Sequence, residues 1–462
     1  MFTFQEIMLQ DILPKWERWA YWVIEIYGIV YSWWRVFVEG EALKNRNLHN
    51  KLHKNWSFLD RPYDSTDYLW SQWMINLKFH LILCLIHIAT SQICRLMRFS
   101  VAMRQCGLVL CDLGCLCMVF GYRAIVFCLL KTLLVYLISQ LGSVAGIWIV
   151  LGGEIIVCHI PEVRSLLSGH SRTVEFEPAL AFLNIKLISF GVDNAQLIRK
   201  NFQNKICVSS ETTLNEKKIT STDDITQPNE TPLTGNTKSS ALKKLSFWAL
   251  GGVGHLVGQF FMIKYVVFYG FGGQLGRFDG VNPYPEPRCV SWVYSYTDMW
   301  KYFDTGLYKF IKTYIYVPLG GSRHGLIRQL AASGVAFLFL YVWHGGTLDL
   351  FIWCFGNYLV CSIEQIGVAV ERSLLGQRLV SAVGPVMQLR IKCLLLVFAH
   401  KASCFQAFFL VLYLDDAREM FENIVLKSSW LQLGTMVGIF YAGIHNAKFL
   451  DCKLSKHYKK LG

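Results

Sequence analysis

The sequence predicts an all-α polytopic membrane protein with about ten transmembrane helices. Of its 462 residues, 53% are hydrophobic, 15% aromatic and only 17% charged, which is unusual for a soluble domain. Long apolar stretches follow one another almost from end to end, so little chain remains for a separate aqueous domain. We therefore expect a single membrane domain whose helices face lipid.

The excess of positive charge does not indicate nucleic-acid binding. The formal net charge is +13, but Lys and Arg lie mostly in short connections between apolar stretches, where they determine membrane topology. The 15 cysteines do not indicate a disulfide framework either. Most lie within apolar runs, such as CGLVLCDLGCLC at residues 106–117, and there they are expected to pack as small apolar side chains.

The helices are predicted from stretches of about 18 or more mainly apolar residues. The first stretch lacks a small-residue cleavage site, so we expect a retained signal anchor. Residues 175–203 contain the shorter run FLNIKLISFGV, which favours an interfacial or re-entrant helix. The transmembrane helices are expected at residues 18–38, 74–97, 101–121, 123–141, 143–160, 245–272, 326–343, 348–370, 390–413 and 430–449.

Composition divides the chain into four parts. A segment rich in Ser, Thr, Asn, Lys, Glu and Pro separates two membrane halves and is typical of a disordered loop. Glycosylation sequons occur at Asn55 and Asn229, and their occupancy stays open. The parts are an N-terminal membrane half at 1–203, the polar loop at 204–244, a C-terminal membrane half at 245–450, and a basic tail at 451–462.

The C-terminal tail indicates a cellular location. It ends in HYKKLG, so Lys459 and Lys460 have the spacing of a dilysine retrieval signal for endoplasmic reticulum membrane proteins. The excess of Lys after Leu450 places this tail in the cytosol by the positive-inside rule. We expect residence in the endoplasmic reticulum membrane, with the Golgi as the alternative.

Residues 273–325 differ from the other connections because they are aromatic, glycine-rich and punctuated by proline. The run YFDTGLYKFIKTYIYVPLGG predicts an amphipathic helix at the headgroup level. Interfacial anchoring explains its aromatic residues but not Asp304. Pro318, Gly320 and Gly321 predict a tight turn after this helix.

Ionisable groups within apolar spans are candidates for function, because inserting one costs about 2.5 to 3.5 kcal/mol. His344 stands out among the histidines because it ends the apolar run FLFLYVW and precedes Gly345 and Gly346, which allow a close backbone or substrate approach. The histidines in or at the ends of apolar spans are His80, His87, His159, His255, His344, His400 and His445.

Three other charged residues favour structural roles. Asp112 and Lys131 fall in consecutive predicted spans, so they are expected to pair across a short hairpin. Glu154 follows Gly152 and Gly153 and is expected to hydrogen-bond to a neighbouring helix.

Two strings, PRCVSWVYSYTDMWKYFDTGLYKFIKTYIYVPLGGSRHG (287–325) and YVWHGG (341–346), closely resemble the membrane-bound O-acyltransferase family. The specific resemblance covers about residues 245–350, and it is to the branch that acylates hedgehog-type secreted proteins. It implies the fold of that family, with His344 and Asp304 as the catalytic pair. Catalytically inactive relatives replace this histidine, so its presence here indicates an active enzyme.

The resemblance implies transfer of palmitate from palmitoyl-CoA to the N-terminal cysteine of a secreted signalling protein, giving an amide. Ligands of the epidermal growth factor receptor are similarly implied as acceptors. Attack on the thioester needs a neutral amine, and His344 near neutral pKa would remove its proton as general base. Asp304 would orient or charge-balance the histidine, or take part in proton transfer.

The resemblance also implies a haem group whose iron is bound by Cys289, for which a purely structural cysteine is the alternative. The basic and aromatic segment 288–328 is expected to hold the CoA phosphates, while the acyl chain lies among apolar helices in a cavity open to both faces. The candidate phosphate ligands are Arg288, Lys309, Lys312 and Arg323.

Other functions stay open at this point. A family member could instead acylate a serine or a lysophospholipid, and a transporter could use intramembrane His and Asp as proton relays. A catalytically silent scaffold is a third alternative. It is favoured by one departure from the family, because related proteins carry a further apolar stretch where this chain has the polar segment 204–244.

Overall fold

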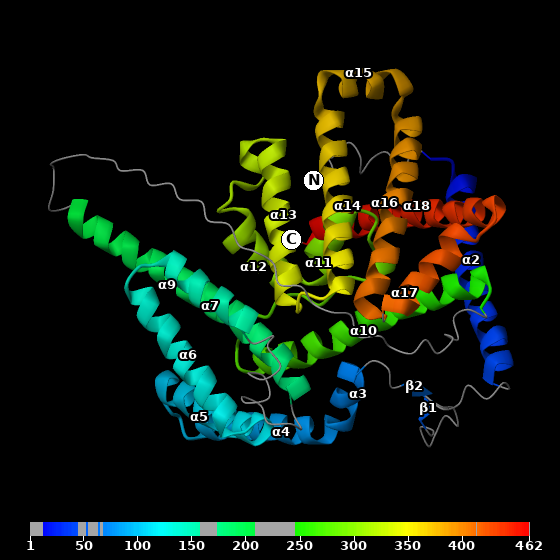
Figure 1. The fold of residues 1–462 in the computed structure, drawn as a ribbon. Coiled ribbons are helices and arrows are strands. Elements are labelled where there is room, and N and C mark those ends of the chain that lie inside the picture. The colour runs from blue at the N-terminus through cyan, green and yellow to red at the C-terminus, as the bar shows by residue number, and fades with distance from the viewer. Residues whose placement is uncertain are drawn as a thin grey trace.

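The computed structural model describes residues 13–44, 52–53, 63–64, 68–157, 173–207, 245–412 and 414–461. Almost all of these residues are helical, which confirms the all-α prediction (Figure 1). The strands among the described residues are the two-residue antiparallel pair β1 (Leu52–His53) and β2 (Tyr63–Asp64). Most of the polar segment 204–244, both sequons and the side chains at the end of the tail lie outside the described residues.

The helices follow the predicted order, and most ends agree with the prediction to within a few residues. The N-terminal half contains α2 (Lys15–Lys44), α3 (Tyr68–Ile75), α4 (Leu77–Leu96), α5 (Val101–Phe120), α6 (Tyr122–Gln140), α7 (Val144–Val157) and α9 (Thr173–Cys207). The C-terminal half contains α10 (Phe247–Phe278), α11 (Tyr296–Phe303), α12 (Thr305–Ile311), α13 (Leu326–Trp343), α14 (Leu348–Arg372), α15 (Leu374–Val383), α16 (Pro385–Val411), α17 (Leu414–Phe421) and α18 (Trp430–Leu461). Short irregular helices are η4 (Val290–Trp292), η5 (Lys312–Tyr316), η6 (Gly321–His324) and η7 (Glu422–Leu426).

Seven of the described helices are long and apolar enough to cross a membrane, so the protein is a multi-pass membrane protein. They are α4, α5, α6, α10, α13, α14 and α16. Three further predicted spans form helices outside this group, because α7 has only 14 residues and α2 and α18 do not meet the same criteria.

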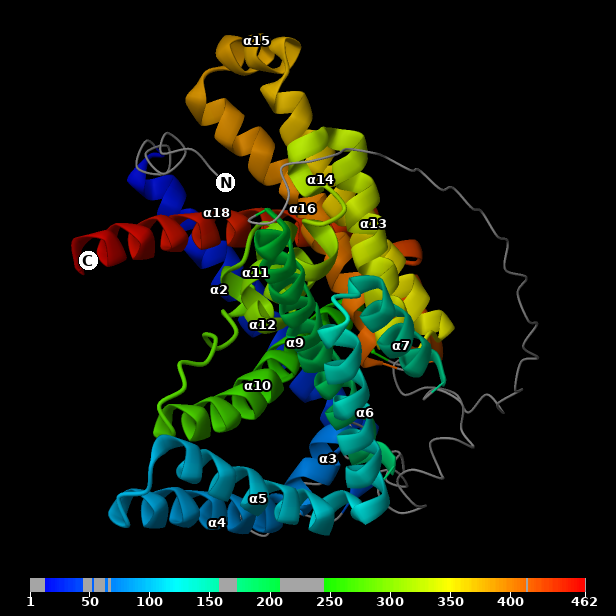
Figure 2. The same ribbon diagram turned by 90° about the vertical axis from the view of Figure 1, so that its left-hand side faces the viewer.

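Helix α9 covers the stretch for which an interfacial or re-entrant helix was predicted. It is one continuous helix of 35 residues, so the chain does not turn back within it. Ile188 and Val192 of α9 pack with Ile147 and Leu151 of α7 in a buried apolar cluster. The helix therefore belongs to the core of the N-terminal half and lies against α6 and α7 (Figure 2).

A polar cluster also fixes α9 to its neighbours. The Lys131 ammonium of α6 lies 2.6 Å from Oε1 of Glu154 on α7 and contacts the side-chain oxygen of Asn184 on α9. The interhelical hydrogen bond predicted for Glu154 is thus confirmed. The predicted pairing of Lys131 with Asp112 is wrong, because Asp112 points toward α4 instead.

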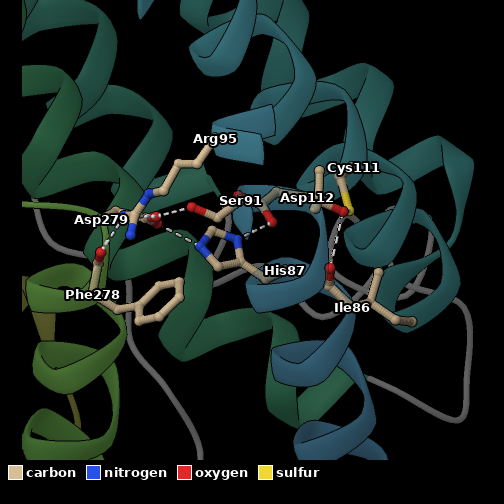
Figure 3. A network of polar contacts seen from close by, with 9 residues as sticks. Ile86, His87, Ser91, Arg95, Cys111, Asp112, Phe278 and Asp279 are labelled. Atoms are coloured by element: carbon tan, nitrogen blue, oxygen red, sulfur yellow. Dashed lines mark hydrogen bonds and ion pairs between the residues drawn. The ribbon is translucent and has the colours of Figure 1, made fainter. Parts of the chain in front are cut away.

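Asp112 belongs to a network between α4, α5 and the end of α10 (Figure 3). Nδ1 of His87 lies 2.8 Å from Asp112, and Nε2 lies 2.6 Å from Asp279. Ser91 donates to Asp279 at 2.6 Å, and the Arg95 guanidinium lies 3.7 Å from the same carboxylate. These contacts join the α4–α5 hairpin to the C-terminal end of α10.

The C-terminal half is built around three long helices. Helix α14 lies between α13 and α16, and the amphipathic helix α15 connects α14 to α16 at one end (Figure 1). Helix α15 occupies a stretch for which no helix was predicted, and α16 begins five residues early because Pro385 suits the first turn of a helix. Helices α2, α10 and α18 pack together on the other side of α16.

The described cysteines are free thiols, as predicted. Those that are buried pack between helices as small apolar side chains. They are Cys94, Cys115, Cys354, Cys361, Cys393 and Cys452.

Candidate active site

His344 lies directly at the end of α13. The helix ends there because Gly345 and Gly346 take φ values of +117° and +70°, a region that side chains with a Cβ rarely adopt. The Tyr341 hydroxyl donates to the Gly346 carbonyl at 2.6 Å and holds this turn. The close approach of a substrate beside these glycines stays a prediction.

The His344 ring is held by two indole rings. Its centroid lies 4.7 Å from the Trp343 ring and 5.2 Å from the Trp353 ring, each in an edge-to-face arrangement. Trp343 donates its indole N–H to the Ala181 carbonyl of α9 at 3.1 Å. The position of the imidazole therefore depends on both membrane halves.

Asp304 interrupts the predicted amphipathic helix, which forms the two short helices α11 and α12 and the irregular turn η5. The residue is the N-cap of α12, where its Oδ1 accepts a hydrogen bond from the Leu307 amide at 2.9 Å. Its Oδ2 accepts from the Tyr269 hydroxyl of α10 at 2.6 Å. Tyr269 was not singled out in the sequence, since it is one of many aromatic residues in an apolar span.

Glu364 of α14 is a second residue that sequence reasoning missed. Its Oε1 accepts from the Tyr296 amide at 2.7 Å, and its Oε2 accepts from the Thr297 amide at 2.9 Å. The hydroxyls of Thr297 and Ser295 also donate to Oε2, at 2.6 and 3.2 Å. Glu364 therefore caps the first turn of α11 from a neighbouring helix, and α11 leads directly to Asp304.

His344 and Asp304 line the same cavity, which has a volume of about 370 Å³. Within the described residues, no hydrogen bond joins them, so they face a shared space rather than each other. The walls come from helices of the C-terminal half and α2, and they are mostly apolar, as the sequence predicted for an acyl-binding cavity. Polar groups on the walls include His255, Gln259, Ser291, Asn357, His400 and Lys401.

The four candidate phosphate ligands do not line this cavity. Arg288 forms an ion pair with Asp451 at 3.1 Å and lies over a tyrosine ring, while Arg323 is exposed in η6. Lys309 and Lys312 are exposed on consecutive elements, each over a tyrosine ring. The structure thus places these cations outside the cavity, and CoA binding by them stays a prediction.

Cys289 precedes η4 and carries a free, half-buried thiol. Cys289 does not line the cavity shared by His344 and Asp304, although the next residue, Val290, does. A free thiol fits the donor chemistry of a thiolate ligand.

Comparison with known proteins shows which family the region around this site resembles. Residues 234–381, which contain His344 and Asp304, match the membrane-bound O-acyltransferase family. The protein-cysteine N-palmitoyltransferase HHAT of Mus musculus is 44% identical over 124 residues, 27% of this chain and 25% of that protein. The protein-cysteine N-palmitoyltransferase Rasp of Drosophila melanogaster is 39% identical over 120 residues, 26% of this chain and 24% of that protein.

More distant similarity extends to the membrane-bound O-acyltransferase GUP1 of Saccharomyces cerevisiae, 36% identical over 76 residues, 16% of this chain and 13% of that protein. The aligned segment spans only about a quarter of the length of the two palmitoyltransferases. The part of the chain that carries His344 and Asp304 is thus similar to the membrane-bound O-acyltransferase family and to these relatives.

Proposed function

We propose that this protein transfers palmitate from palmitoyl-CoA to the N-terminal cysteine of a hedgehog-type secreted protein. The observation that carries the proposal is the shared cavity, which offers both a histidine and a carboxylate to one substrate-sized, mostly apolar space. The similarity to two protein-cysteine N-palmitoyltransferases supports this acceptor. Ligands of the epidermal growth factor receptor that begin with cysteine are a further class of acceptor.

The proposed reaction is attack of an amine on a thioester. The nitrogen of the acceptor bonds to the palmitoyl carbonyl carbon, the carbon–sulfur bond breaks, and the CoA thiolate leaves. His344 takes the proton from the attacking nitrogen and delivers it to the leaving sulfur, so the enzyme returns to its starting state. The glycine turn after His344 leaves room for both substrates beside the imidazole.

Asp304 faces the same space without touching His344, so its role is electrostatic rather than a direct relay. A carboxylate near the reacting atoms stabilises the positive charge that develops on the nitrogen and then on the imidazole. Tyr269 and the Leu307 amide hold this carboxylate in one orientation. Catalysis then depends on the relative positions of α10, α12 and α13.

The donor binds by two kinds of contact in this proposal. The palmitoyl chain lies in the apolar part of the cavity, where its burial from water is favourable. The CoA phosphates lie outside, where the exposed cations Lys309, Lys312 and Arg323, with Arg288, attract them. The protein would act in the endoplasmic reticulum membrane with its C-terminal tail in the cytosol.

We propose that Cys289 would hold the iron of a haem group through its sulfur. Its free thiol provides the single donor that thiolate-ligated haem needs, and the haem, when bound, adds an iron centre apart from the acyl-transfer chemistry. Purified wild type should show a haem absorbance band that Cys289→Ser lacks. A cysteine with a structural role predicts the absence of that band from both proteins.

The acyl-transfer proposal is tested with labelled palmitoyl-CoA and a short peptide that begins with cysteine. Wild type should transfer the label into a bond that survives hydroxylamine, which identifies an amide, whereas His344→Ala should lose about 100-fold or more in rate. His80→Ala, a histidine of α4 outside the cavity, is the matched control and should keep wild-type activity. Hydroxylamine-labile product would indicate a serine ester or thioester, and folded wild type without any transfer would favour a scaffold.

A further inference from the structure

We propose that His255, Gln259 and Ser291 form a binding site for a secondary amide of one substrate, on the wall of the cavity that holds His344. This inference rests on the proposed acyl transfer, since both palmitoyl-CoA and a peptide acceptor carry secondary amides. His255 and Gln259 lie one turn apart on α10, and Ser291 belongs to η4. All three side chains line the cavity, and we call them the amide subsite.

The three side chains form a closed set of short contacts. The side-chain amide of Gln259 lies 2.6 Å from Oγ of Ser291 and 3.2 Å from Nε2 of His255. Oγ of Ser291 lies 3.4 Å from the same ring nitrogen. The Trp33 ring covers the imidazole at a centroid distance of 5.5 Å, so the cluster is held from α2 as well.

The three side chains carry hydrogen-bond donors and acceptors that their mutual contacts do not use. If the Gln259 nitrogen faces its partners, it donates to Ser291 and His255, so Nε2 of the neutral imidazole accepts and Nδ1 carries the remaining hydrogen. The unused groups are then the Nδ1–H donor and the Gln259 carbonyl acceptor. If the Gln259 amide is turned over, the unused groups are the amide NH₂ donor and the Nδ1 acceptor. Either assignment leaves at least one donor and at least one acceptor unused.

These two groups remain open to the cavity. Among the described residues, no side chain or backbone group forms a hydrogen bond with Nδ1 of His255 or with the second polar atom of the Gln259 amide. Other histidines differ, since both ring nitrogens of His445 are sealed from solvent without a partner. The subsite therefore has an unused donor and an unused acceptor on the wall of a mostly apolar cavity.

A secondary amide offers the complementary pair, one N–H and one carbonyl. Burying such a group in an apolar cavity without a partner is unfavourable, so a wall with one donor and one acceptor selects and orients it. The amide can come from the pantetheine arm of acyl-CoA or from the backbone of the acceptor peptide. The same hydrogen bonds serve either source, and binding measurements separate the two.

The test measures binding without turnover. In a His344→Ala parent, dissociation constants are measured for a thioether analogue of palmitoyl-CoA and, separately, for a short peptide that begins with cysteine. Gln259→Met and His255→Phe remove the free donor and acceptor while keeping side-chain volume. The matched control is Gln365→Met, because Gln365 also bonds a serine, Ser333 at 3.1 Å, but does not line the cavity.

The subsite predicts a selective loss. Gln259→Met should raise the dissociation constant of one ligand roughly three- to tenfold, the effect of losing a neutral hydrogen bond, and leave the other unchanged. The affected ligand identifies the source of the amide, and Gln365→Met should change neither constant. Equal changes for both ligands, or none, would overturn the subsite while leaving the acyl-transfer proposal intact. A parent that binds neither ligand would overturn both.

Discussion

At the scale of single residues, the site depends on groups that hold the reacting side chains. His344 is fixed by a glycine turn and two indole rings, and Asp304 by one tyrosine and one backbone amide. The pair itself is a prediction from the resemblance of two strings to a known family, since the residue pattern alone singled out His344 and gave Asp304 no role. Their partners were not predicted, since an apolar span does not show which of its aromatic residues faces a carboxylate.

Tyr269→Phe tests whether this positioning matters. The substitution removes the 2.6 Å hydrogen bond to Asp304 and keeps the ring. Hydrogen bonds to charged groups contribute about 1.5 to 3 kcal/mol, so kcat should fall roughly 10- to 100-fold with little change in KM for palmitoyl-CoA. Tyr314→Phe, which breaks another Tyr–Asp bond of 2.8 Å to Asp193 outside the cavity, should leave kcat unchanged. An equal loss in both variants would show that a general effect on folding is responsible.

At the scale of elements, hydrophobic periodicity and length predict the helices well but not their partners. The long apolar helices of both halves lie where the sequence placed them. Asp112 was assigned the wrong partner because the face that each helix presents to its neighbours depends on packing that a single span does not encode. Helix α15 and the break at Asp304 were missed because both are short and partly polar, so apolar length gives no signal for them.

Helix α11 leads directly to Asp304 and so can position this candidate catalytic residue. Glu364→Gln keeps one acceptor for the first turn of α11 but loses the negative charge, whereas Glu364→Ala loses both. We expect kcat to fall in the order wild type, Glu364→Gln, Glu364→Ala, with the affinity for palmitoyl-CoA retained. Glu371→Gln is the matched control, because Glu371 lies on the same helix two turns later and pairs with Lys392 rather than with α11.

The graded order distinguishes positioning from simple destabilisation. If Glu364 acts only on stability, Glu364→Gln and Glu371→Gln should lower the thermal midpoint and kcat in parallel. If it positions Asp304 through α11, kcat falls in the Glu364 variants at temperatures where they remain folded. A smaller loss in Glu364→Gln than in Glu364→Ala would then show that α11 needs more of this side chain than its negative charge.

At the scale of the whole molecule, the apolar composition determines that the outer surface faces lipid rather than water. Many large apolar side chains are exposed on the described helices, which is unfavourable in water but expected in lipid. The sequence predicted this surface because the apolar stretches have no polar face. It did not predict the cavity walls, since these combine residues from α2, α10, α11, α14, α16 and α18 that are far apart in the chain.

An aspartate placed on the outer surface of α6 tests whether this helix faces lipid. Leu130 lies in the middle of α6 with 61% of its surface exposed, and Leu141 lies at the end of the same helix with 80% exposed. In water both substitutions would be tolerated, because neither side chain is buried. In a bilayer, Leu130→Asp should cost about 2.5 to 3.5 kcal/mol and lower the yield of folded protein, whereas Leu141→Asp reaches the interface and costs little. Equal yields, measured by size-exclusion chromatography in mild detergent after membrane extraction, would contradict a lipid-facing α6.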